Sequence, residues 1–141
     1  MTSRIAQLTS RYLLPVMIAI SIIVFFRGHH QPGGGFIAAL IATSGIIFNA
    51  MVTETKTAYR RLFFDPVILM ASGMSFCFLS AAAGPLTGRP LFYGYWAEIK
   101  LPLLNKISLG TPLLFDAGVY FVVTGALMMV FLLIMEEIAW K

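Results

Sequence analysis

Residues 27–40 read RGHHQPGGGFIAAL, and this stretch separates two long apolar runs. Pro32 prevents a preceding helix from continuing, and the three glycines after it permit positive φ angles and close backbone approach. Phe36 then restarts an apolar segment. A glycine-rich turn can also cradle a phosphate, but the Lys and Ser/Thr of a Walker loop do not follow, and both flanks read as helix. The stretch therefore predicts a bend between two closely packed helices.

The composition indicates that lipid covers much of the protein surface. Of the 141 residues, 59% are hydrophobic and 11% are charged. Soluble domains carry about 25% charged residues, and a soluble fold of this size has too little interior to hide so much apolar surface. Four runs with almost no charge have about the length of a spanning helix, which needs roughly 20 residues. These runs are 12–26, 33–53, 66–88 and 109–135.

We therefore predict an all-α integral membrane protein with a single four-helix transmembrane domain over residues 1–141. The expected helices are 9–27, 34–53, 66–86 and 111–135. The loops are short apart from residues 89–108, where the aromatic run FYGYW is followed by isolated charges. Since Tyr and Trp favour the headgroup layer, this composition predicts an interfacial segment between the third and fourth helices. A docking surface for a partner is the alternative for this segment.

The basic residues predict the orientation of the spans. Six of them lie on the side of both termini, and four lie on the opposite side. The first set is Arg4, Arg11, Lys56, Arg60, Arg61 and Lys141, and the second is Arg27, Arg89, Lys100 and Lys106. Because basic residues favour the cytoplasmic side, this split predicts a multi-pass protein with cytoplasmic termini. The net charge of +4 then reflects topology, and no nucleic-acid partner is expected.

A stripe of small residues follows the bend. Its members recur at spacings of three and four and therefore share one face of the second helix. They are Gly35, Ala38, Ala42, Gly45 and Asn49. In lipid, small residues let helices approach closely, and van der Waals contact then holds them together. We expect a helix-packing motif made of Pro32, Gly33, Gly34, Gly35, Phe36, Ala38, Ala42 and Gly45.

Asp116 is the one ionisable residue within the last apolar run. Acids inside a membrane are costly and are therefore functional candidates. Tyr120 and Thr124 follow at spacings of four, so Asp116, Tyr120 and Thr124 form a polar stripe that is a candidate ion path. The alternative is a structural role. Thr111 and Pro112 are typical of a helix start, which places Asp116 about one turn inside, where interfacial water and the helix dipole tolerate it.

His29 and His30 are adjacent in the bend. Adjacent residues do not face each other on a helix, and no third ligand accompanies them, so we expect no metal site and no cofactor. Interfacial histidines bonded to backbone or lipid are one interpretation, and a proton relay is the other. No pattern of nucleophile and base indicates a catalytic site.

Two longer signatures resemble those of a known family. The first is GHHQPGGGFIAALIA at 28–42, and the second is LPLL at 101–104 followed by LGTPLLFDAGVYFVVTGALM at 109–128. Both resemble the signatures of the MrpB/MnhB family, the B subunits of multisubunit Mrp-type Na⁺/H⁺ antiporters, and the resemblance covers essentially the whole chain. It implies an accessory subunit of a monovalent cation/proton antiporter in the bacterial plasma membrane, supporting sodium export and alkaline pH homeostasis.

The same resemblance implies partners. These are the large A and D subunits and the small subunits of a hetero-oligomeric complex, together with lipid, Na⁺ and H⁺. The alternative is a structural or assembly subunit of a related membrane-bound hydrogenase or complex I-like complex. Four helices with one buried acid are too few for an autonomous transporter, which normally shows repeats and broken helices. Two roles stay open, namely a contribution of Asp116 to an ion route and the packing of neighbouring subunits against the glycine stripe.

Overall fold

The computed structural model describes residues 4–28, 34–52, 65–101 and 104–139. Within these ranges the chain forms four helices and one two-stranded hairpin. Their order is α1 (Arg4–Arg27), α2 (Gly35–Val52), α4 (Pro66–Leu86), β1 (Trp96–Leu101), β2 (Leu104–Gly110) and α5 (Thr111–Ala139). All four helices are long and apolar enough to cross a membrane, which confirms the predicted four-helix transmembrane fold.

The helices extend beyond the apolar runs at some ends. Helix α1 begins at Arg4, whereas 9 was expected, and α5 continues to Ala139 past the expected 135. Charge marks where a helix leaves the hydrocarbon layer, but backbone hydrogen bonds continue into the headgroup region. The N-terminus of α4 is well defined. The Asp65 carboxylate accepts a hydrogen bond of 2.8 Å from the Val67 N–H, and Pro66 occupies the first turn.

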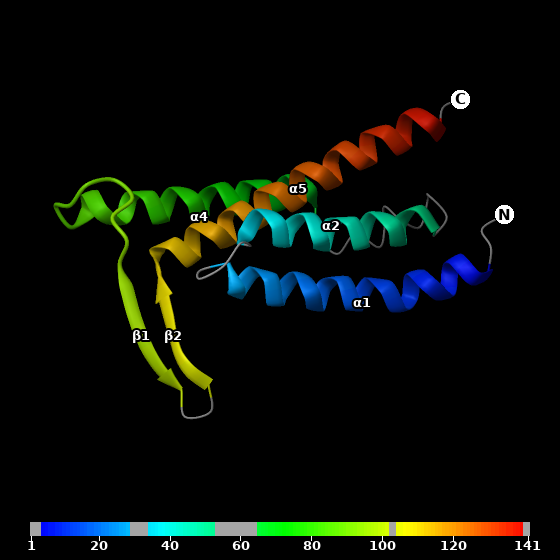
Figure 1. Cartoon of the computed structure of the whole chain (residues 1–141). Coiled ribbons are helices and arrows are strands. Elements are labelled where there is room, and N and C mark those ends of the chain that lie inside the picture. The colour runs from blue at the N-terminus through cyan, green and yellow to red at the C-terminus, as the bar shows by residue number, and fades with distance from the viewer. Residues whose placement is uncertain (1–3, 29–33, 53–64, 102–103, 140–141) are drawn as a thin grey trace.

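The helices form two antiparallel pairs (Figure 1). Helix α1 lies beside α2 and α4 lies beside α5, and the pairs meet where α2 packs against α5. Helices α2 and α5 run in the same direction, so the start of one lies near the start of the other. Both termini are at one end of the molecule, and the hairpin is at the other.

Helices α4 and α5 contact each other through their backbones. A Cβ atom added to Gly73 would lie 2.6 Å from the Gly118 carbonyl oxygen, and one added to Gly118 would lie 2.7 Å from the Gly73 carbonyl oxygen. A Cβ atom on Gly125 would lie 2.8 Å from the Pro66 carbonyl oxygen. Real Cβ atoms do not approach backbone atoms so closely, so any larger residue at these three positions must separate the helices.

The segment between α4 and α5 contains the hairpin. Strands β1 and β2 pair antiparallel, with Trp96 opposite Gly110 and Ile99 opposite Ile107. The pair projects away from the helices in Figure 1. The predicted interfacial segment 89–108 thus contains strands that we did not assign, although Glu98 to Leu101 alternates polar and apolar residues with the period of a strand.

Candidate functional site

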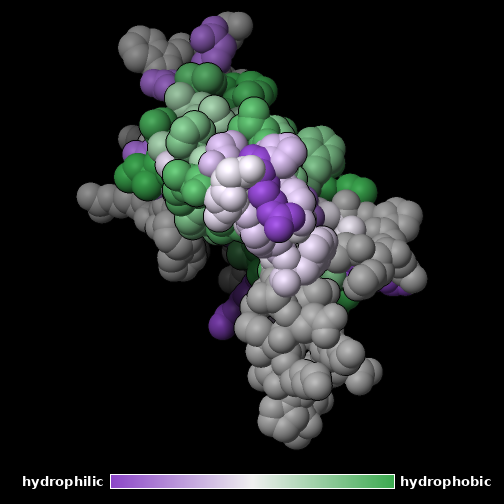
Figure 2. All heavy atoms as spheres, turned by 90° about the vertical axis from the view of Figure 1, so that its left-hand side faces the viewer, coloured by the Kyte–Doolittle hydropathy of each residue, from purple (hydrophilic) through white to green (hydrophobic). Residues whose placement is uncertain are grey.

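A pocket of about 360 Å³ opens at the hairpin end of the helices, and Asp116 lies on its wall. Its lining comes from the ends of α1 and α4, the loop that carries the aromatic residues 92–95 (the aromatic loop), β1 and the start of α5. The residues are Gly28, Ser80, Phe92, Trp96, Thr111, Pro112, Phe115 and Asp116. Figure 2 faces this end and shows strongly hydrophilic side chains among weakly polar ones, with hydrophobic residues around them. Since a water molecule takes about 30 Å³ of liquid, the pocket has room for several.

Hydrogen bonds to Thr111 fix the walls of this pocket. The Thr111 N–H donates to the Tyr95 carbonyl oxygen at 3.1 Å, and the Thr111 hydroxyl accepts from the Tyr95 N–H at 3.1 Å. From α4, the Ser80 hydroxyl donates to the Thr111 carbonyl oxygen at 2.6 Å. The start of α5, the end of α4 and the aromatic loop are therefore held in one arrangement around Asp116.

Asp116 lies where α2 begins against α5. Gly34 has a φ of +89°, and a Cβ atom added there would lie 3.4 Å from Asp116 Oδ2. A Cβ atom on Gly35 would fall against the Asp116 carbonyl oxygen. The positive end of the α2 dipole therefore lies beside the half-buried Asp116. In the described parts of the chain, no side chain or backbone group forms a hydrogen bond or ion pair with the Asp116 carboxylate.

Tyr120 continues this face of α5 into a junction of three helices. The Ser21 hydroxyl of α1 donates to the Ala38 carbonyl oxygen of α2 at 2.8 Å, and it lies 3.0 Å from the Tyr120 hydroxyl. A hydroxyl has one proton, and Ser21 uses its proton on Ala38, so Tyr120 is the donor to Ser21. Ser21 is fully buried. The chain Tyr120 to Ser21 to Ala38 thus connects α5, α1 and α2.

Thr124 lies one turn further along the same face. Its side chain is 5% exposed, and its hydroxyl has no hydrogen-bond partner among the described residues. Thr43 of α2 is 1% exposed, and its hydroxyl is likewise without a partner in the described residues. We call the face formed by Asp116, Tyr120 and Thr124 of α5, together with Ser21 and Thr43, the polar seam.

The small-residue stripe of α2 contacts helices of the same chain. Gly35 meets α5 at Asp116, whereas a Cβ atom on Gly45 would lie 2.8 Å from Met17 Cβ of α1. Ala38 and Ala42 are also buried. The stripe is therefore filled within this chain. Phe36 is 55% exposed and points away from these contacts. His29, His30, Pro32 and Gly33 lie outside the described residues.

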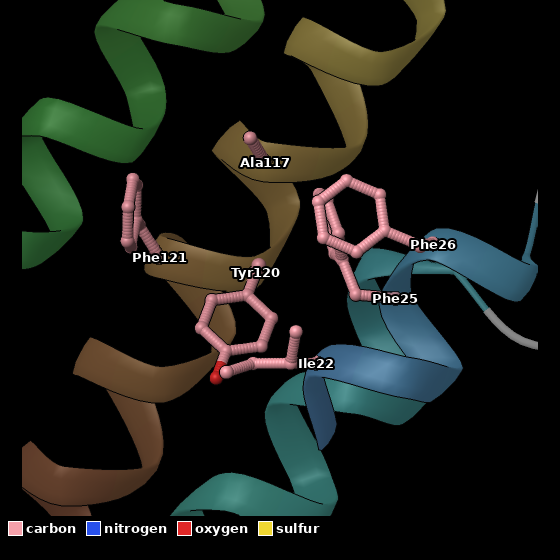
Figure 3. A pocket seen from close by; sticks show the side chains of 6 residues that line it. All are labelled: Ile22, Phe25, Phe26, Ala117, Tyr120 and Phe121. Carbon is pink, nitrogen blue, oxygen red and sulfur yellow. The ribbon is translucent and has the colours of Figure 1, made fainter. Parts of the chain in front are cut away.

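An apolar groove of about 250 Å³ lies beside the polar seam, between α1 and α5. Ile22, Phe25 and Phe26 line it from α1, and Ala117, Tyr120 and Phe121 line it from α5, as Figure 3 shows. The rings of Phe25 and Tyr120 pack edge to face, with their centroids 5.8 Å apart. Because the Tyr120 hydroxyl is hydrogen-bonded to Ser21, the surface of this groove consists of aliphatic and aromatic carbon atoms.

Several of the residues in these contacts were not predicted from the sequence. Ser21 and Thr43 belong to the polar seam, and Gly73 and Gly118 form the α4–α5 contact. The α4 glycine had a usable signal, since Gly73, Cys77, Ser80 and Gly84 recur at spacings of three and four. The two hydroxyls had none, because isolated Ser and Thr are common in apolar helices.

Four membrane-spanning helices with a half-buried acid at the mouth of a polar seam define a small multi-pass membrane protein. The family model described as "Domain related to MnhB subunit of Na+/H+ antiporter" matches residues 5–129. The chain therefore belongs to this family, and the family resemblance drawn from the two signatures is confirmed.

Individual relatives agree with this assignment. The chain is 30% identical over 128 residues to the Na(+)/H(+) antiporter B subunit of Alkalihalophilus pseudofirmus OF4, covering 91% of this chain and 89% of that one. It is 30% identical over 133 residues to the Na(+)/H(+) antiporter B subunit of Bacillus subtilis 168, covering 94% and 93% of the two chains. Among solved structures it is similar to the Mrp complex from Dietzia sp. DQ12-45-1b, with a TM-score of 0.77 and 29% identity over 91% of this chain. It spans 13% of the chain matched there.

Proposed function

We propose that this chain is an accessory subunit of a multisubunit monovalent cation (Na⁺)/proton antiporter, and thus part of a secondary transporter with no enzymatic role. It forms a single transmembrane domain and assembles with large A and D subunits and with small subunits. In that complex it supports sodium export and alkaline pH homeostasis. Family membership and the antiporter names of both bacterial relatives favour this function over that of a hydrogenase-type assembly subunit.

The observation that carries a direct role for this subunit is the position of Asp116. The carboxylate lies on the wall of a pocket that has room for water, and the polar seam continues from it into the membrane. Acids within membrane helices are costly and rare, and they commonly mark routes for ions or protons. We propose that Asp116 exchanges a proton or a monovalent cation with the pocket, and that Tyr120 and Thr124 extend this route.

The experiment that tests this role compares Asp116→Asn with Asp116→Ala in everted vesicles. Asn keeps the size and hydrogen bonding of Asp but cannot carry charge. We expect the Asn complex to assemble in normal amounts and to lose part of its cation-driven proton movement, and the Ala complex to lose at least as much. Normal exchange by the Asn complex at every pH would limit Asp116 to anchoring.

We also propose that the protein lies in the bacterial plasma membrane with both termini in the cytoplasm. The two termini are at one end of the structure and the hairpin is at the other, so only the absolute direction depends on the charge split. We expect cysteines placed near residues 2 and 58 to be shielded from an impermeant thiol reagent in intact cells, and one near residue 94 to be labelled. The opposite labelling pattern would invert this topology.

A further inference from the structure

The hydroxyls of Thr43 and Thr124 are the unusual feature of the polar seam. Both side chains are at least nine-tenths buried, at 1% and 5% exposed, and neither hydroxyl has a partner within the described residues. A buried hydroxyl without a hydrogen bond is destabilising. Val has nearly the same volume as Thr and would fill each position without this cost. The presence of Thr therefore indicates that the hydroxyl binds a group outside the described residues.

Exposed helical hydroxyls in this protein bond to the backbone of their own helix. The Ser44 hydroxyl donates to the Leu40 carbonyl oxygen at 2.7 Å, and the Ser75 hydroxyl donates to the Ala71 carbonyl oxygen at 2.9 Å. This bond to residue i−4 is the ordinary solution for Ser and Thr in a helix. Thr43 and Thr124 do not make this bond, so their hydroxyls are available to another group.

Thr43 and Thr124 lie at the same depth along the parallel helices α2 and α5. Helices α2 and α5 run in the same direction, and Gly35 touches the backbone of Asp116 where they meet. Thr43 and Thr124 each lie eight residues further along, which is about 12 Å deeper along both helices. Between these levels lies the Tyr120 to Ser21 hydrogen bond of 3.0 Å. Hydroxyl groups therefore recur along the seam from Asp116 inward.

We propose that the Thr43 and Thr124 hydroxyls bind water and, with Tyr120 and Ser21, form a proton relay that leads inward from Asp116 and excludes metal cations. The proposal rests on the proposed function and specifies which ion this part of the subunit carries. A hydroxyl can accept one hydrogen bond while donating another, so it passes a proton without acquiring a lasting charge. A sodium ion would need several oxygen ligands to replace its hydration shell. The seam offers few, because Ala38, Ala39 and Ala42 fill its α2 side at 0–1% exposure.

Each step of the relay conserves protons. The Asp116 carboxylate takes a proton from a hydronium ion in the pocket, which leaves a water molecule, and passes this proton to the first water or hydroxyl inward. Each following hydroxyl or water oxygen accepts a proton on a lone pair and releases its own proton to the next, so one proton enters and one leaves. Ser21 first turns its O–H from the Ala38 carbonyl oxygen, which has no proton to release, to a water in the seam. Every hydroxyl is neutral at the end. The Ser21 and Tyr120 hydroxyls must then rotate back to their starting bonds before the next transfer.

The test uses the whole antiporter complex in proteoliposomes, with sodium-driven proton movement and complex content both measured. The variants are Thr43→Val and Thr124→Val, which remove the hydroxyl at nearly constant volume, and Thr43→Ser and Thr124→Ser, which keep it. We expect each Val form to assemble and to exchange about fivefold more slowly per complex, equivalent to about 1 kcal/mol of barrier. The Ser forms should stay within about twofold of the native rate.

Matched variants separate the relay from packing. Ser44→Val removes a hydroxyl of α2 that is exposed and bonded to its own helix, and it should leave exchange unchanged. Where Val disturbs assembly, Ala removes the same hydroxyl with a smaller side chain, and the rate per assembled complex should follow the hydroxyl and not the volume. Native exchange in the Val or Ala forms would overturn the relay. If Asp116→Asn is slow while these forms are normal, the relay fails and the proposed function stands; absence of coupled exchange in the native complex would remove both.

Discussion

Two faces of helix α5 pack against their neighbours in different ways. Toward α4, Gly118 and Gly125 bring the backbone of α5 close to the backbone of α4, and α4 side chains such as Cys77 and Met70 pack directly against these glycines. Toward α1 and α2, Asp116 lies against the start of α2 and Tyr120 bonds to Ser21 of α1. The side chains of Asp116 and Thr124 on this face make no hydrogen bond to any described residue. The same helix therefore has one face that holds it in place and one face with unused polar capacity.

The difference shows how a small membrane subunit can contain polar chemistry and still keep its shape. Glycine contacts let two helices approach closely enough for strong dispersion attraction, and glycine has no side-chain rotamers. Hydroxyl and carboxylate side chains have several rotamers and several possible partners, so they fix the relative position of two helices only weakly. We infer that the α4 contact fixes α5, and that this leaves the opposite face free to exchange partners.

The largest effect is expected on the glycine face. Gly118→Leu should abolish assembly of the complex, because even a Cβ atom would lie 2.7 Å from the Gly73 carbonyl oxygen. Leu would force α4 and α5 apart and would displace Asp116 with them. The measurement is the amount of this subunit that co-purifies with its partners in mild detergent.

Val130→Leu is the control for this substitution, since Val130 lies on α5 and is 54% exposed. It should assemble in native amounts. A stable, active complex with Leu at residue 118 would mean that α4 does not fix α5, and the contrast between the two faces would lose its basis.

Much of the fold could be predicted from the sequence because membrane spans follow from simple solvation. The four apolar runs predicted helices close to those observed. The small-residue stripe predicted close packing of α2, but not that Gly35 would meet Asp116 of α5. The hairpin was missed, because the FYGYW aromatics and isolated charges of its segment were interpreted as interfacial composition. The period-two pattern from Glu98 to Leu101 is short and lies beside them.

The polar seam was predicted only along its own helix. The spacing of Asp116, Tyr120 and Thr124 predicts one shared face, and the contacts of Asp116 with α2 and of Tyr120 with α1 agree with this prediction. Ser21 and Thr43 were missed because their meaning depends on which helices are neighbours. In lipid all faces of a helix are apolar, so periodicity does not tell which face meets which partner.

The intermediate effect is expected in the polar seam. Tyr120→Phe removes the hydroxyl that donates to Ser21 and keeps the ring that packs against Phe25 at 5.8 Å. We expect the complex to assemble, with a loss of about 1 kcal/mol of stability and a several-fold slower exchange. Thermal denaturation of the purified complex and vesicle proton movement measure the two effects.

Tyr12→Phe is the matched control, because Tyr12 is on α1 and is 70% exposed. It should change neither measurement. If Tyr120→Phe is equally silent, the seam is a second packing face, and the polar groups on α5 have no shared task.

The smallest effect on ion exchange is expected at Gly34, which lies beside Asp116 near the start of α5. Gly34 and Gly88 both have positive φ, at +89° and +72°, so Ala should cost about 1 kcal/mol or slightly more at either position. Their surroundings differ, since a Cβ atom on Gly88 meets nothing within 4 Å, whereas one on Gly34 lies 3.4 Å from Asp116 Oδ2. Gly34→Ala and Gly88→Ala should therefore lower the melting temperature of the complex by similar amounts. Only Gly34→Ala should also slow exchange, on the order of twofold, because its methyl group takes space beside the carboxylate that water or a cation would use. Equal exchange rates in the two variants would show that the approach of α2 to Asp116 serves packing alone.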